Sequence, residues 1–215
     1  IRLLHGEAVR RLTALPAVQA AGLMHAGPFL SSISMNMRAP GIDSMPRLPG
    51  GGPYYFTGTT GTLEAHQVRL LRGRLWRDAD LDSAAQPTVI ITRRMAEAVW
   101  PGKDALQQCV IVDDRACAPV IGVIADLRRQ QLREQPFLAL FWPMGVGGDR
   151  PPGSPQVLVR MRGAGRRAEP LIRRVLLEVD PNQPYVTIVP YESFVDPRAR
   201  SWRLGASVLS AFGAL

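Results

Sequence analysis

Cysteine is scarce in this chain of 215 residues, which contains only Cys109 and Cys117. Two cysteines are too few for a disulfide-rich scaffold, and without neighbouring histidines they do not have the spacing of a zinc site. The three histidines, His5, His25 and His66, also lie far apart in the sequence. We therefore predict that the chain holds no metal site.

The sequence also lacks the short motifs that many enzymes use for phosphate binding or nucleophilic attack. The glycines at 50–52 have no following Lys-Ser or Lys-Thr, and no Gly-x-Ser-x-Gly occurs. The run DADLD at 78–82 resembles the start of a calcium loop, but Ser83 stands where that loop needs glycine and Val89 where it needs glutamate. We predict no catalytic residues, no cofactor and no ATP hydrolysis by this chain alone.

Acidic residues are fewer than basic ones, with 18 Asp and Glu against 26 Lys and Arg and a formal net charge of +8. The arginines occur as scattered pairs, such as those at 10–11 and 173–174, rather than in one run. This scatter favours solvated helix faces over a nucleic-acid track. A charged content of 20% beside 46% hydrophobic residues predicts a folded, globular chain.

Hydrophobic periodicity organises the first third of the chain. An amphipathic pattern at 1–15 predicts a helix that ends at Pro16, and an extended run at 18–27 predicts a strand. Residues 31–66 are rich in Ser, Met, Gly and Pro, which predicts short strands separated by turns.

The middle of the chain predicts a strand at 88–92 followed by a short helix. The apolar face of that helix is formed by Met95, Ala96, Val99 and Trp100. Pro101 and Gly102 end it. We expect Trp100 to pack in a hydrophobic core.

Further elements follow in the second half. Two apolar runs around a polar tip at 109–126 predict a hairpin, and 137–143 reads as a buried strand. Residues 156–161 alternate with period two, 166–179 have a helical apolar stripe, and 185–189 are again extended. The last three predict a strand-helix-strand unit, with a right-handed crossover if its strands are parallel.

Both ends of the chain therefore carry a helix and a strand, which predicts an α+β fold. We expect an α+β subdomain of residues 1–30 and 154–197, with 31–153 as an inserted, mostly β subdomain. The run from 204 to 215 is apolar and uncharged, and it contains no signal that ends a helix.

The stretch LLRGRLWRDADLDSAAQPTVIITRRMAEAVWPGKDAL at 70–106 resembles the MacB-like periplasmic core domain of FtsX-like ABC-transporter permeases, particularly the duplicated macrolide-exporter-like permeases. The positions similar to the family pattern are Gly73, Arg74, Trp76, Asp80, the strand at 89–91, Trp100, Pro101 and Gly102. The blocks PVIGVIADLR, FWPM and the region from 157 to 194 are also similar to the family. The sequence QQC at 107–109 departs from it, because the family has a Gly-Lys or Gly-Arg turn there.

The resemblance implies a strand-helix-strand, porter-like subdomain close to the membrane and a mechanical function without catalysis. It also implies that 198–215 begin a transmembrane helix that is truncated here, since a span needs about 20 apolar residues. A cytoplasmic ABC ATPase subunit would drive the transmembrane helices of the full-length permease. This domain would move on the outer side of the bacterial inner membrane, facing the periplasm or the cell exterior, and help to export or extract a substrate. A second permease copy, as a dimer partner or a duplicated half, and the membrane itself would be its other partners, with no nucleic acid.

The periplasmic location implied by the resemblance bears on the two cysteines. A hairpin with Asp113 at its tip places Cys109 directly opposite Cys117, where a disulfide can form and an oxidising compartment lets it persist. A hairpin register shifted by one residue instead puts the two side chains on opposite faces and leaves free thiols.

Two other function classes remain open from the residues. A soluble ferredoxin-like module that binds RNA or another anionic partner accords with the positive charge, but such modules carry aromatic residues on the sheet face, and VLVRMRG has none. A hydrolase needs a nucleophile beside a base, and the sequence shows no such pair.

Overall fold

The computed structural model describes residues 2–131, 133–147, 154–163, 168–182 and 186–195. Its helices are α1 (Arg2–Thr13), α2 (Thr60–Ala65), α3 (Arg93–Val99) and α4 (Glu169–Val179), with short 3-10 turns at Asp78–Leu81 and Ala105–Gln107. Its strands are β1 (Val18–Ala26), β2 (Ile33–Ser34), β3 (Met37–Arg38), β4 (Tyr54–Gly58), β5 (Leu70–Gly73), β6 (Val89–Thr92), β7 (Cys109–Val112), β8 (Ala118–Ile124), β9 (Ala139–Pro143) and β10 (Gln156–Met161).

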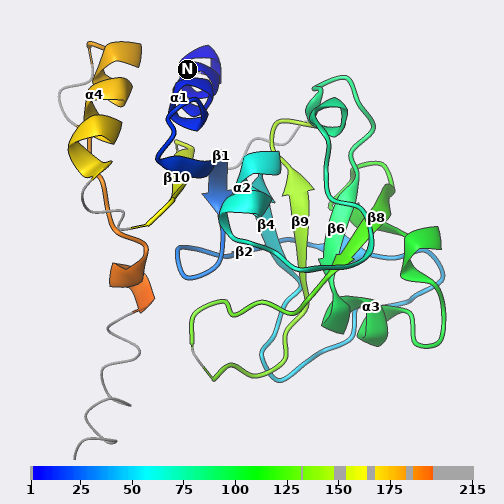
Figure 1. Ribbon diagram of the computed structural model, residues 1–215. Coiled ribbons are helices and arrows are strands. Elements are labelled where there is room, and N and C mark those ends of the chain that lie inside the picture. Colours follow the sequence, from blue (N-terminus) through cyan, green and yellow to red (C-terminus); the bar gives the residue numbers. More distant parts are fainter. Residues whose placement is uncertain (1, 132, 148–153, 164–167, 183–185, 196–215) are drawn as a thin grey trace, which may run out of the picture.

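The described strands join into one mixed sheet (Figure 1). Its strand order is β10-β1-β4-β9-β6-β8-β7-β3. Outside this order, β2 pairs with β4 and β5 pairs with β8. The pairs β4·β9 and β6·β8 are parallel, and the other pairs are antiparallel. The fold is therefore α+β, as the sequence predicts.

The central strands are buried on both faces of the sheet, because consecutive side chains point to opposite faces. Ile91 and Leu140 belong to the core cluster that contains Trp142, whereas their neighbours Ile90 and Phe141 belong to a second cluster. Strands covered on both sides read as continuous apolar runs. This arrangement explains why 88–92 and 137–143 show no polar alternation.

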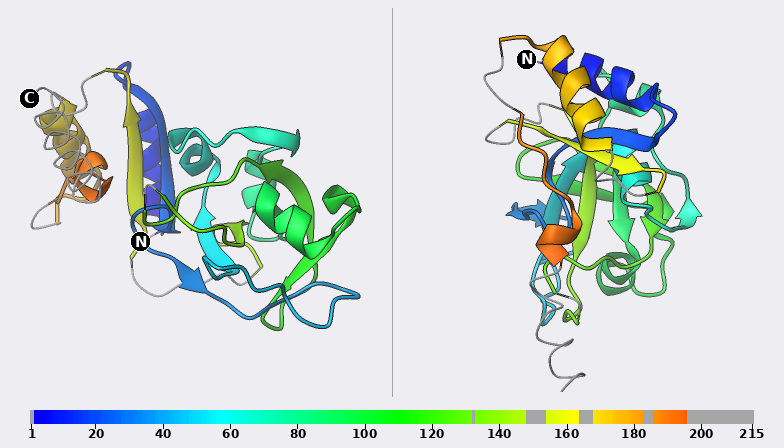
Figure 2. Two further views of the ribbon diagram at one scale, coloured as in Figure 1. Left: turned by 90° about the horizontal axis from the view of Figure 1, so that it is seen from below. Right: turned by 60° about the vertical axis from the view of Figure 1, so that its left-hand side comes forward.

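The two chain ends meet at the β10 end of the sheet. β1 and β10 are antiparallel neighbours, with Ala21 opposite Val159, so the strands expected near each end share one sheet. Figures 1 and 2 show α1 and α4 side by side there. Leu12 of α1 and Ile172 of α4 pack in one cluster with Ala21. The sheet runs from β1 into β4 without a break, and the division into two subdomains stays a prediction.

The third strand of the expected strand-helix-strand unit does not form in the described residues. Residues 186–190 are irregular, and the prediction of a strand there was wrong. Side-chain contacts hold this segment instead: Arg173 of α4 donates a hydrogen bond to the Val186 carbonyl, and Ile188 packs against the cluster of α1 and α4. Pro190 has no N–H to give to a sheet.

The hairpin of β7 and β8 has a different register from the expected one. Cys109 lies opposite Pro119, not opposite Cys117, so the pairing is displaced by two residues. The turn explains part of the displacement, because the Arg115 N–H donates to the Val112 carbonyl and Asp113 adopts a left-handed φ of 51°. A displacement of two keeps both cysteines on the same face of the hairpin.

Among the described residues, no helix combines the length and the apolarity that crossing a membrane requires. The run expected to begin a transmembrane helix, 198–215, lies outside them.

Candidate functional site

Among the residues that resemble the family motif, Arg74 and Asp80 form a hydrogen-bonded pair after β5, which we call the clasp. Arg74 donates two hydrogen bonds to Asp80, 2.6 Å from Nη1 to Oδ2 and 2.8 Å from Nη2 to Oδ1. The Arg77 amide donates to the same carboxylate at 2.7 Å. The hydrogen bonds from Arg74 and from this amide hold the pKa of Asp80 below its usual range, and Asp80 raises the pKa of Arg74. The pair closes the turn after β5.

Gly73 and Trp76 position this clasp against β8 and β6. Gly73 has a φ of +75°, and a Cβ there would lie 2.2 Å from the Ile121 carbonyl oxygen, so only glycine fits. Trp76 is buried, and its Nε1 donates to the Thr88 carbonyl at 3.3 Å. These contacts give Gly73, Arg74, Trp76 and Asp80 an architectural role.

Trp100, Pro101 and Gly102 end α3 on the opposite face of the sheet. Trp100 is 3% exposed and packs in the cluster that holds Trp142, as expected from the helical stripe. Gly102 has a φ of +72°, and no atom lies within 4 Å of the position of a Cβ. Glycine is therefore favoured there by the left-handed backbone conformation and not by a lack of space.

Cys109 and Cys117 are joined in the structure by a disulfide, with their Cα atoms 5.5 Å apart. The bond ties the two strands of the β7–β8 hairpin beside its turn. The observed register places both cysteines on the same face of the hairpin, which allows the bond to form.

The strongest functional candidate is residues 186–195, which we call the C-terminal strap; the sequence predicts a strand at 185–189 and no functional site there. Figure 2 shows it passing from α4 along the outer side of β10. Arg173 and Ile188 hold its first half, as described above. Tyr191 fastens its second half by donating a hydrogen bond to the Pro28 carbonyl. The strap therefore connects α4 with the loop that follows β1.

Tyr191 is the centre of an aromatic cluster. Its ring meets the rings of Phe29, His66 and Phe194 edge to face, with centroids 6.4, 5.7 and 6.2 Å away. Burial raises the pKa of Tyr191 to about 12, so its hydroxyl stays a donor at neutral pH. The sequence signal for this anchor is weak, an aromatic residue in the short run YESF after Pro190.

His66 lies at the inner side of the cluster, at the end of α2. Burial and, to a smaller extent, the charge of Arg160 lower its pKa to about 4, so the imidazole is neutral at pH 7. Its Nε2 is buried without a hydrogen-bond partner among the described residues. Arg160 of β10 donates to the Ala65 carbonyl at 2.7 Å and so holds the end of α2 against the sheet. The ring packs edge to face against Tyr191 of the strap.

The backbones of helix α2 and strand β1 approach each other closely at two glycines. A Cβ at Gly22 would lie 2.2 Å from the Thr62 nitrogen, and one at Gly61 would lie 1.8 Å from the Ala21 carbonyl oxygen. Thr62 also donates to the Leu23 carbonyl at 2.6 Å. The strap, α2, β1 and β10 are therefore joined by direct contacts.

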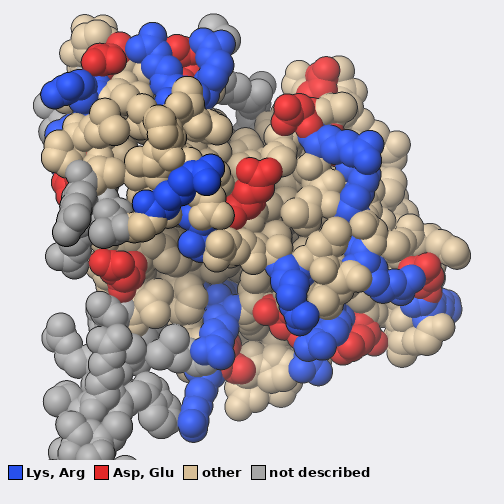
Figure 3. Space-filling view, viewed as in Figure 1, with Lys and Arg blue, Asp and Glu red and all other residues tan. Residues whose placement is uncertain are grey.

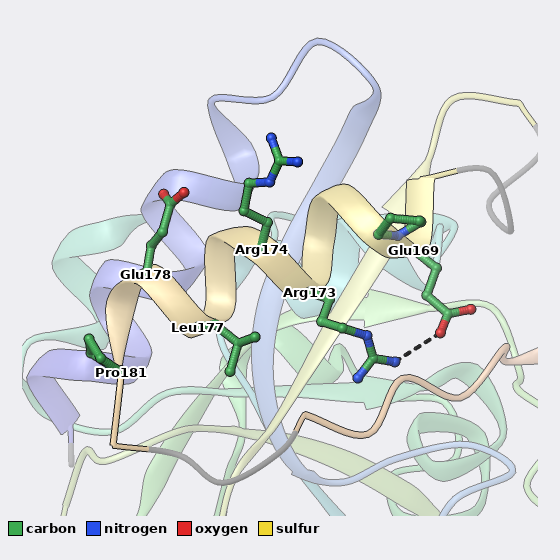
Figure 4. A pocket seen from close by; sticks show the side chains of 7 residues that line it. Glu169, Arg173, Arg174, Leu177, Glu178 and Pro181 are labelled. Carbon is green, nitrogen blue, oxygen red and sulfur yellow. Dashed lines mark hydrogen bonds and ion pairs between the residues drawn. The ribbon is translucent and has the colours of Figure 1, made fainter.

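The outer face of α4 is hollowed over about 860 Å³ (Figure 4). Pro170, Leu177 and Pro181 supply its apolar surface, and Arg173 pairs with Glu169 at 3.0 Å along its wall. The described residues hold no cluster of three metal-ligating side chains, in this hollow or elsewhere. The aromatic rings of the central strands, at Tyr55, Phe56, Phe141 and Trp142, are buried, so they offer no stacking surface for RNA.

Solved structures share this fold. The periplasmic region of MacB from Actinobacillus actinomycetemcomitans matches with a TM-score of 0.60 and 16% identity, over 83% of this chain and 75% of that one. The extracellular domain of the noncanonical ABC-type transporter YknZ from Gram-positive bacteria matches with a TM-score of 0.56 and 16% identity, over 86% and 88%. A permease-protein domain from Porphyromonas gingivalis matches with a TM-score of 0.51 and 16% identity, over 80% of this chain and 67% of that one. No protein-family profile and no curated protein sequence matches the chain.

Proposed function

The chain has the fold of the MacB periplasmic region, and from this we propose that it is the extracytoplasmic domain of an ABC-transporter permease. In this proposal the domain is non-catalytic. It couples the motion of transmembrane helices, driven by ATP hydrolysis on another subunit, to export or extraction of a substrate on the outer side of the membrane.

The observation that carries the proposal is the shared fold. The three structures belong to MacB, to the transporter YknZ and to a permease protein, and each match spans at least 80% of this chain. The resemblance of the 70–106 stretch to the same family supports it from the sequence side.

The C-terminal strap supplies a route for the coupling. Two residues lie between it and 198–215, the run that we expect to begin a transmembrane helix. Tyr191 fastens the strap to Pro28 and to the ring of His66, and α2 is packed on the β1 backbone. A pull on the strap would thus move the sheet rather than unwind a loose tail.

The proposal implies specific partners and a location. A cytoplasmic ABC ATPase subunit would act through the full-length permease, and a second permease copy or a duplicated half would complete the transporter. Flanking helices would hold the domain at the bacterial inner membrane, facing the periplasm or the cell exterior.

Co-purification tests the proposal. The full-length protein is expressed with its ABC ATPase subunit, membranes are collected by ultracentrifugation, and the permease is purified in detergent. We expect the protein in the membrane fraction, the ATPase in the purified complex, and ATP hydrolysis by that complex. A full-length protein that stays in the supernatant without detergent and binds no ATPase would overturn the proposal.

A further inference from the structure

A second hollow, of about 520 Å³, lies where β6 and β8 end. We call it the arginine hollow, because Arg94, Arg128 and Arg133 line it, over a floor that includes Leu127 and Phe137. β6 and β8 are parallel, so their carboxyl ends meet at this edge of the sheet. Figure 3 shows basic side chains gathered with a few acidic ones on the lower part of this face, below the central strands.

The acidic groups of the hollow are occupied by other partners. Asp126 accepts hydrogen bonds from the Arg93 guanidinium at 2.9 Å and from the Arg94 amide at 2.7 Å. Glu134 pairs with the Arg129 guanidinium at 3.4 Å and accepts from the Gln130 amide at 3.1 Å. Arg93 and Arg129 thereby neutralise the two carboxylates, and the hollow keeps a positive charge.

Two arginines of the hollow remain available to a ligand. Within the described part of the chain, no carboxylate lies within ion-pair distance of Arg94 or Arg128. Arg128 is exposed and Arg94 is half-buried, so both guanidinium groups can reach a molecule in the hollow. A guanidinium matches the two oxygens of a carboxylate or a phosphate better than an ammonium does.

Part of the lining is held in place from behind. Glu134, which lines the hollow, pairs with Arg129, and the Arg129 guanidinium lies over the Tyr54 ring, 4.2 Å from its centroid, and donates to the Ser32 hydroxyl at 3.3 Å. Phe137 is 6% exposed, and Leu127 packs against the core cluster of Phe137. A site with fixed walls loses less conformational freedom on binding than a mobile one.

We propose that the arginine hollow binds an anion whose carboxylate or phosphate group is attached to an apolar body. The anionic group would pair with Arg94 and Arg128, and the apolar body would cover the exposed part of Leu127 and the small exposed edge of Phe137. The inference goes beyond the proposed function, since it concerns a binding site on this chain and holds or fails whether or not the chain belongs to a transporter.

Isothermal titration calorimetry of the protein at low salt tests the site with two probes, hexyl phosphate and inorganic phosphate. We expect saturable binding of hexyl phosphate, at least tenfold tighter than that of inorganic phosphate. The double variant Arg94→Gln/Arg128→Gln should weaken hexyl phosphate binding at least tenfold. Arg174→Gln, an exposed arginine on α4, is the matched control and should bind like the parent protein.

A second experiment, binding to lipid vesicles, shows whether the anion is a lipid headgroup or a soluble molecule. Vesicles of phosphatidylglycerol that bind the parent protein and not the double variant, with phosphatidylcholine vesicles as blank, identify a lipid headgroup. Hexyl phosphate binding without vesicle binding identifies a soluble anion, and both results support the site. Absence of saturable hexyl phosphate binding, or equal affinity in the double variant with an unchanged thermal midpoint, overturns it. Equal affinity for both phosphates overturns the apolar part of the proposal.

Discussion

Arg74 donates two hydrogen bonds, of 2.6 and 2.8 Å, to Asp80, which lies six positions later in the sequence. The Asp80 side chain is 13% exposed, whereas that of Arg74 is 39% exposed, so solvent screens the pair in part. We expect Asp80→Asn to lower the free energy of unfolding by about 1 to 2 kcal/mol, because a charge-assisted bidentate pair is lost. Urea denaturation at pH 7 measures this, and an unchanged midpoint would contradict the structural role.

The same pair predicts a pH dependence. The pKa of Asp80 is lower in the folded protein than in the unfolded chain, where it is near 3.8. The contribution of the pair is therefore present above the unfolded pKa and is lost as the pH falls through the lowered folded pKa. The difference in unfolding free energy between the parent protein and Asp80→Asn should be constant from pH 7 to about pH 5 and shrink below about pH 4. A difference that grows on acidification would contradict the assignment.

The low pKa of His66 should make the free energy of unfolding fall on mild acidification. Its pKa is about 4 in the folded protein, against 6.5 for an ordinary histidine. Between these values the unfolded chain binds a proton that the folded protein does not, so the free energy of unfolding falls as the pH drops from 6.5 to 4. The loss amounts to at most about 3 kcal/mol.

Two measurements check the His66 prediction. NMR should show the His66 ring protons titrating near pH 4. The variant His66→Gln should show a shallower decline in the free energy of unfolding between pH 6.5 and 4 than the parent protein. A ring that titrates near 6.5 would mean that His66 is solvated and that the strap does not cover it.

Tyr191 should determine how firmly the strap is held. Tyr191→Phe removes the hydrogen bond to the Pro28 carbonyl, which we expect to favour strap opening by about 1 kcal/mol, or roughly fivefold. Tyr191→Ala also removes the ring contacts and should have a larger effect. Hydrogen exchange at the Ser193 and Phe194 amides reports on this, since both donate within the strap.

The matched control for Tyr191 is Val189→Ala, because Val189 lies on the same segment and is 49% exposed. It should leave the exchange of the strap amides unchanged. If Tyr191→Ala exchanged like the parent protein, the strap would be held by contacts other than the aromatic cluster, and the proposed coupling route would lose its anchor.

The disulfide between Cys109 and Cys117 predicts the thiol chemistry of the protein. Labelling of the denatured, unreduced protein with a maleimide should find no free thiol, and two thiols per chain would refute the bond. Reduction should lower the free energy of unfolding by roughly 2 to 3 kcal/mol, because the short loop between the cysteines gains freedom in the unfolded chain.

Elements with strong local periodicity could be predicted from the sequence. Helix α1 and the strand at 88–92 have apolar patterns that match the faces they bury in the folded protein. Helix α2 was missed, since TGTLEA is short and rich in residues with weak helix propensity. It forms because Thr62 donates to the Leu23 carbonyl and Gly61 permits contact with the β1 backbone.

The candidate site was less predictable than the fold. Tyr191 and His66 are separated by more than 100 positions in the sequence, and no local pattern indicates that their rings meet. The expected strand at 185–189 failed for a related reason. An extended apolar run becomes a strand only if a partner strand accepts it, and here Ile188 packs on helices α1 and α4 instead.

The central claim, that this domain faces the outer side of a membrane, is tested most directly by labelling a surface cysteine. Ser44 is exposed, so Ser44→Cys in the full-length protein gives a thiol that a membrane-impermeant maleimide can reach. In intact spheroplasts the account predicts labelling of Ser44→Cys to the same extent as after permeabilisation, with the parent protein unlabelled. Labelling that occurs only after permeabilisation would place the domain in the cytoplasm and contradict the account.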